Sequence, residues 1–123
     1  MTDDAPAPRP RWQTVQVVGC AAVIGWTLAY VLCDWSGWPR LTFDQYTAAW
    51  SWTTGPTPRV PINYMGIILW GMGGGAVAAL LALAGLRLWR RPLPPVVLGL
   101  ASAWALTGVL LAGAYYTWNL WPF

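Results

Sequence analysis

Long uncharged stretches divide the chain into three predicted membrane spans. Each stretch is long enough to supply the roughly 20 apolar residues that cross a bilayer as a helix. We therefore predict an all-α integral membrane protein with three transmembrane helices. The uncharged stretches are Trp12–Cys33, Val60–Leu86 and Pro92–Phe123, and the predicted helices cover about residues 12–33, 62–86 and 94–117.

The first span is interpreted as a retained helix and not as a cleaved signal peptide. Arg9 and Arg11 precede it, as basic residues precede a signal sequence, but the apolar stretch is long and lacks a small-x-small cleavage site. Cys33 does not fit a lipoprotein cysteine, because Leu32 stands where a small residue is expected.

Arginines predict the orientation of the spans. Arg9 and Arg11 flank the start of the first span, and Arg87, Arg90 and Arg91 lie in the short turn between the second and third. Cytoplasmic loops carry the excess of basic residues, so both sites are predicted to be cytoplasmic. The protein would then be a multi-pass protein of a bacterial inner membrane, with a flexible cytoplasmic tail at 1–11, a periplasmic loop at 34–61 and a periplasmic C-terminus.

The periplasmic loop contains a pattern that predicts a short interfacial helix. The segment from Thr42 to Gln45 resembles a capping box, and Phe43, Tyr46 and Trp50 follow at helical spacing on one face. The proline-rich segment 55–61 would then form an extended link into the second span. A docking surface for a partner is the alternative interpretation of this aromatic, proline-rich loop.

Tryptophan is unusually frequent, with 11 in 123 residues. Most lie near the predicted membrane boundaries, which is typical of an aromatic belt, and Trp118 and Trp121 at the end of the chain are further candidates for partner contacts. Trp26, Trp70 and Trp104 lie deeper in the spans. Each needs a buried partner for its indole N–H or must face a pigment, a quinone or a neighbouring subunit.

Small residues recur at about four-residue intervals along each span. Such stripes allow helix backbones to approach closely, so they predict helix-packing faces. The glycine-rich run in the second span is not a phosphate-binding loop, because it lies inside a span and no lysine follows it. The predicted packing residues are Ala21, Gly25, Ala29, Gly71, Gly75, Ala79, Gly108 and Ala112.

Composition limits the chemistry further. Only 9% of residues are charged, and histidine is absent, so no haem, chlorophyll or copper can be bound through imidazole. The spans carry no ionisable acid or base of the kind that proton relays and ion pathways need. The arginines adjoin apolar segments, which indicates membrane orientation and not nucleic-acid binding. No metal site is expected. The identity of any cofactor is left open, and the candidates are a lipid, carotenoid, chlorophyll or quinone at the surface.

Three short segments resemble a known membrane family. They are FDQYTAAW at 43–50, LRLWRR at 86–91 and GAYYT at 113–117. Their order is similar to the N-terminal half of the C subunit of the membrane-bound copper monooxygenases for methane and ammonia. The metal-binding Asp and His residues of that family lie beyond the third segment, where this chain has no counterpart. The resemblance therefore implies a structural relative without the copper site.

Taken together, these patterns favour a non-catalytic accessory subunit of a larger membrane protein complex, expected to be bioenergetic: respiratory, photosynthetic or oxygenase. Its partners would be that complex and membrane lipids. No nucleophile and base are paired in the sequence, so an enzyme is not expected. A pigment- or quinone-binding module, and a small oligomeric transporter or channel, are the alternatives.

Overall fold

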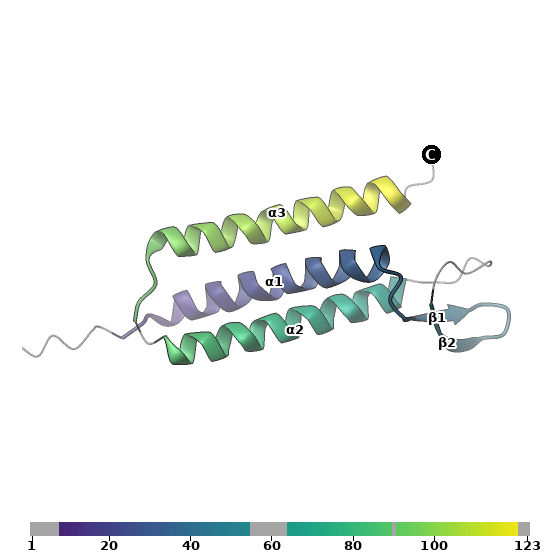
Figure 1. The fold of residues 1–123 in the computed structure, drawn as a ribbon, viewed down its shortest axis with the longest axis horizontal. Helices are drawn as coiled ribbons and strands as arrows, with labels where there is room; N and C mark the ends of the chain where they lie inside the picture. The colour runs from purple at the N-terminus through teal and green to yellow at the C-terminus, as the bar shows by residue number, and fades with distance from the viewer. Residues whose placement is uncertain (1–7, 55–63, 90, 121–123) are drawn as a thin grey trace, which may run out of the picture.

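Three long helices and one β-hairpin make up the fold of the computed structural model, which describes residues 8–54, 64–89 and 91–120. The elements in chain order are α1 (Arg11–Trp35), β1 (Arg40–Asp44), β2 (Ala49–Thr53), α2 (Tyr64–Leu88) and α3 (Pro95–Leu120) (Figure 1). Each helix is long and apolar enough to cross a membrane. The predicted set of three membrane-length helices is therefore present, and the helices extend slightly beyond the predicted spans.

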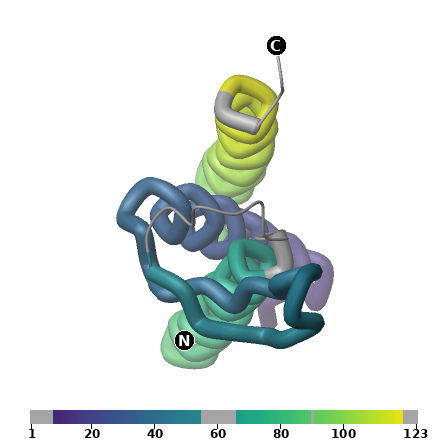
Figure 2. Tube along the Cα trace, turned by 90° about the vertical axis from the view of Figure 1, so that its right-hand side faces the viewer, coloured from purple at the N-terminus to yellow at the C-terminus, as the bar shows by residue number. Residues whose placement is uncertain are grey.

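The helix α1 lies between the other two (Figures 1 and 2). Both α2 and α3 pack on α1, and neither packs extensively on the other. Successive helices run in opposite directions, so the start of α1 and the α2–α3 connection share one end of the bundle, which we call the arginine end. The hairpin β1–β2 and the last turn of α3 lie at the other end, which we call the hairpin end.

The chain leaves α1 through a turn that satisfies the last helical carbonyls. Gly37 has a φ of +61°, a left-handed conformation that glycine adopts without strain. Its N–H donates to the Asp34 carbonyl, and the Trp38 N–H donates to the Cys33 carbonyl at 3.1 Å. These two bonds form a Schellman motif, which ends the helix and redirects the chain into β1.

The prediction of a short interfacial helix in the loop after α1 is wrong, because this segment forms the antiparallel hairpin β1–β2. Phe43 faces Trp50 directly across the two strands, and their ring centroids lie 5.1 Å apart. The Asp44 carboxylate accepts a hydrogen bond from the Tyr46 N–H inside the connecting turn, at 2.9 Å. The acidic residue that was interpreted as part of a helix cap therefore stabilises a turn.

Glycines bring the backbones of α1 and α2 into direct contact. A Cβ atom placed on Gly25 would lie 2.5 Å from the Gly74 carbonyl oxygen and 2.5 Å from Ala78. A Cβ placed on Gly75 would lie 2.9 Å from the Ala22 carbonyl oxygen. Because lipid provides no hydrophobic force that drives helices together, such close van der Waals contact is a main source of cohesion.

Polar side chains join α1 to α3 and to the turn that precedes it. The buried Gln13 accepts a hydrogen bond from the Leu93 N–H at 3.0 Å, and Gln16 donates to the Ser102 hydroxyl at 2.9 Å. Arg9 donates to the carbonyls of Leu86 and Arg91, so it caps the end of α2. These bonds satisfy polar groups that lipid could not.

Candidate functional site

An apolar groove runs between α2 and α3, with α1 as its floor. It consists of two adjoining cavities of about 450 and 460 Å³, which share Trp26 and Val109 in their linings. The Trp26 ring stacks on Tyr30 at 5.2 Å between centroids, and this pair forms the floor. Five of the nine wall residues are small, and the other four are Ile68, Met72, Val109 and Tyr116. The small ones are Gly75, Ala76 and Ala79 from α2, and Ala112 and Gly113 from α3.

The predicted packing residues are divided between contacts inside the chain and this groove. On α1 and α2, Gly25 faces Gly74, Ala29 also faces Gly74, and Gly71 faces the Trp26 ring. Gly75 faces Ala22 and borders the groove, and Gly108 on α3 faces Thr27. Ala79 and the buried Ala112 line the groove, and Ala21 is half-buried on α1. The glycines that bind α1 to α2 are thus already occupied within the chain.

The three deep tryptophans do not form a common pocket. Trp26 lies in the groove floor, whereas the Trp70 indole N–H donates to the Pro39 carbonyl at 2.7 Å and its ring packs edge-on against Trp38. Trp104 is 68% exposed on α3 and lines neither groove cavity. Of the residues proposed for a pigment or quinone, Trp26 lines the groove between α2 and α3.

Trp70 instead connects α2 to the hairpin. Replacing Trp70 with phenylalanine removes the donor to Pro39, and a hydrogen bond of this kind contributes about 1 kcal/mol. We expect hairpin amides to exchange with deuterium roughly fivefold faster in this variant. Trp104→Phe is the matched control, since Trp104 is largely exposed, and it should leave hairpin exchange unchanged. Equal exchange in both variants would contradict this role of Trp70.

The hairpin has an unusual distribution of polar and aromatic faces. Thr42 is only 2% exposed, and its hydroxyl bonds to Ser51 and Thr53 on the opposite strand. The alternate positions carry Trp50 and Trp52, which are exposed. The exposed tryptophans on this face are suited to contact with another apolar surface.

The residues proposed for partner docking all lie at the hairpin end where the structure describes them. Phe43 packs on Trp50, Tyr46 stands exposed at the hairpin turn, and Trp118 is exposed on the last turns of α3. Trp121 lies outside the described residues, as do positions 1–7 of the predicted tail and the proline-rich segment 55–61.

Sequence reasoning missed a polar cluster at the hairpin end, formed by Asp34, Arg40 and Tyr115. The Asp34 carboxylate forms an ion pair with the Arg40 guanidinium at 2.9 Å and accepts a hydrogen bond from the Tyr115 hydroxyl at 2.9 Å. The cluster joins α1, β1 and α3. Its only signal in the sequence is one acid and one base near the end of the first span.

The described residues present apolar surface and hydrogen-bonded polar pairs. No group of three or more His, Cys, Asp or Glu side chains gathers within residues 8–54, 64–89 and 91–120. Cys20 and Cys33 are free thiols, and Cys33 is buried beside the polar cluster's Asp34. Apolar grooves thus lie along the helices, and the polar contacts lie toward the two ends of the bundle.

Comparison of the chain with protein families, with curated proteins and with solved structures finds no match. The resemblance to a copper monooxygenase subunit stays a prediction from three short segments.

Proposed function

We propose that this chain is a non-catalytic accessory subunit of a larger integral membrane complex, and that a transmembrane helix of the partner occupies the groove between α2 and α3. One observation carries the proposal: α2 and α3 both pack on α1 but not extensively on each other. A fourth helix in that groove would complete a four-helix bundle, the usual arrangement in which every helix has two neighbours.

The groove walls suit a helix better than a lipid chain. Small residues such as Ala76, Ala79 and Gly113 let a helix backbone approach closely, which provides the van der Waals contact that joins helices in membranes. A lipid chain gains no comparable advantage from small walls, because large and small aliphatic side chains offer it similar contact. The α1–α2 glycines, by contrast, are occupied and are not part of the docking face.

The hairpin provides a second contact with the partner, outside the membrane. Figure 1 shows the strands continuing beyond the ends of α1 and α2. β1 begins beside Gly66 in the first turn of α2, and Phe43 lies three residues beyond Arg40, a rise of about 10 Å. We therefore infer that Phe43 and the exposed Trp50 lie at or beyond the headgroup layer, where aromatic side chains can contact a partner protein.

Membrane orientation follows from the arginine end. Arg9, Arg11, Arg87 and Arg91 lie there, and the positive-inside rule assigns this end to the cytoplasm. We infer a bacterial inner-membrane protein with the hairpin and C-terminus in the periplasm. Alkaline phosphatase fused to the C-terminus should be active, as expected for a periplasmic C-terminus. Green fluorescent protein fused at the same place should not fluoresce. The reverse pair of results would overturn this orientation.

The function is tested by mild-detergent pull-down of the tagged chain from native membranes, with mass spectrometry and an absorbance spectrum of the eluate. We expect stoichiometric recovery with a larger membrane complex, and a bioenergetic complex is the class to test first. Recovery as a lone chain or a colourless homo-oligomer would overturn the proposal and favour the transporter alternative. A lone chain with visible absorbance would favour the pigment-binding alternative.

A further inference from the structure

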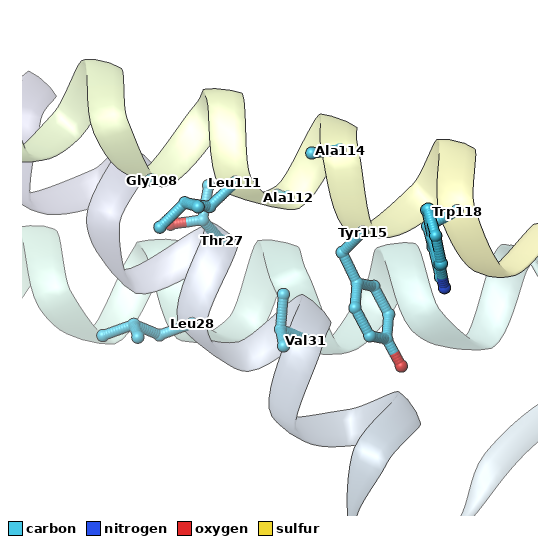
Figure 3. A pocket seen from close by; sticks show the side chains of 9 residues that line it. All are labelled: Thr27, Leu28, Val31, Gly108, Leu111, Ala112, Ala114, Tyr115 and Trp118. Carbon is cyan, nitrogen blue, oxygen red and sulfur yellow. The ribbon is translucent and has the colours of Figure 1, made fainter.

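A second groove lies on the other side of the α1–α3 contact and shares only Ala112 with the groove described above. Its cavity measures about 560 Å³, and its walls are almost entirely apolar. Figure 3 shows Thr27 and Leu28 near one end, and Tyr115 and Trp118 projecting from α3 at the other. The groove therefore runs along the helices from the middle of the membrane toward the hairpin end.

The hairpin end of this groove is polar. Tyr115 lines the cavity and donates its hydroxyl proton to Asp34, which in turn pairs with Arg40. Trp118 also lines this end and is 88% exposed, with its indole nitrogen visible at the mouth (Figure 3). Tryptophan and tyrosine at this level are typical of the layer where acyl chains meet headgroups.

Arg40, which pairs with the Asp34 carboxylate beyond the Tyr115 end of the groove, has an unfilled hydrogen-bond position. Its side chain is only 12% exposed, and its Nε–H is buried without an acceptor among the described residues. A buried donor of this kind costs free energy unless an acceptor is supplied. Asp34, at 25% exposure, remains reachable from outside. One positive and one negative group thus lie side by side, and Tyr115 connects this pair to the end of the apolar groove.

We propose that this groove binds a phosphatidylethanolamine molecule of the hairpin-side leaflet. An acyl chain lies between α1 and α3, the lipid ammonium bonds to Asp34, and the lipid phosphate lies at the exposed part of the Arg40 guanidinium. The paired charges complement a zwitterionic headgroup, whereas an anionic headgroup would meet the Asp34 carboxylate without compensation. A choline headgroup has no N–H donor for that carboxylate. The site does not depend on the proposed partner groove.

Native mass spectrometry of the delipidated full-length chain tests the proposal, by titration with phosphatidylethanolamine, phosphatidylcholine and phosphatidylglycerol of identical acyl chains. We expect phosphatidylethanolamine to bind about tenfold more tightly than either, the effect of one charge-assisted hydrogen bond. Asp34→Asn should remove most of this preference. Tyr115→Phe removes the hydrogen bond that positions the Asp34 carboxylate at the groove and should therefore weaken the preference severalfold. Tyr116 lines the other groove, so Tyr116→Phe should leave the preference unchanged.

A second pair of variants tests the apolar part of the site without changing its charges. Ala114→Leu narrows the groove and should lower the affinity for all three lipids, whereas Ala103→Leu, an exposed α3 position outside the lining, should not. Equal affinity for the three lipids in the wild-type chain would overturn the headgroup assignment. Equal binding by Ala114→Leu and Ala103→Leu would overturn the groove as the acyl site.

Discussion

Replacing Gly74 with alanine is expected to destabilise the protein by about 2 kcal/mol, the usual scale of overpacking in a close-packed interface. A Cβ atom at this position would lie 2.6 Å from the Gly25 carbonyl oxygen and would also overlap the Ala29 side chain. Neither obstacle is the flexible end of a long side chain, so the helices themselves must move apart. The α1–α2 contact holds α2 on the bundle. We therefore expect this variant to unfold at a lower dodecyl sulfate concentration than the wild type, as measured by titration with that detergent.

Gly73→Ala is the matched control for this prediction. It is the neighbouring residue on the same helix, and a Cβ atom there meets nothing within 4 Å. Since alanine is the better helix former by up to about 1 kcal/mol, this variant should be as stable as the wild type or slightly more so. If the two variants unfold at the same point, the close contact between α1 and α2 does not hold the bundle together.

The spans were predictable because charge and length alone determine which segments can lie in hydrocarbon. The small-residue stripes could also be recognised in the sequence, but the residues that they contact could not. Gly74 was outside the proposed stripe and yet has the closest contact with Gly25. A repeat of four residues identifies a helix face, whereas the rotation of one helix against another depends on the whole set of contacting side chains.

The hairpin was missed because its sequence supports two periodicities. Phe43, Tyr46 and Trp50 have helical spacing, but Leu41 and Phe43 on one strand and Trp50 and Trp52 on the other alternate as strands do. β-Branched and aromatic residues favour the strand, and cross-strand pairs such as Phe43 with Trp50 add stability that a lone surface helix lacks. A capping-box match alone could not decide between them.

The polar contacts between distant segments could not be predicted from the sequence. Tyr115 and Asp34 are 81 positions apart, and Gln16 and Ser102 are 86 apart. Each of these residues is ordinary in its local sequence, and only the docking of α3 on α1 makes them partners. The groove between α2 and α3 is likewise a product of that docking, since no single span indicates which of its faces remains open.

Replacing Gly113 with leucine is expected to lower recovery of the partner complex at least tenfold in the pull-down, while the isolated chain stays folded. Gly113 lines the groove between α2 and α3, and a Cβ atom there meets nothing within 4 Å inside the chain. The added side chain therefore occupies only the space assigned to the partner helix. A leucine side chain here keeps the partner helix away from the groove wall and so removes the close backbone contact on which membrane helices depend. A loss of about 1.4 kcal/mol of binding free energy already lowers the affinity tenfold.

Gly99→Leu is the control, because Gly99 lies on the same helix, also faces open space, and lines none of the cavities described above. It adds the same side chain to α3 without entering the groove, so recovery of the complex should match that of the wild type. If Gly113→Leu lowers the unfolding midpoint, Ala76→Leu on the opposite wall provides the same obstruction from α2. Full recovery of the complex with folded groove variants would place the partner on another face, and the open α2–α3 groove would then no longer support an accessory role.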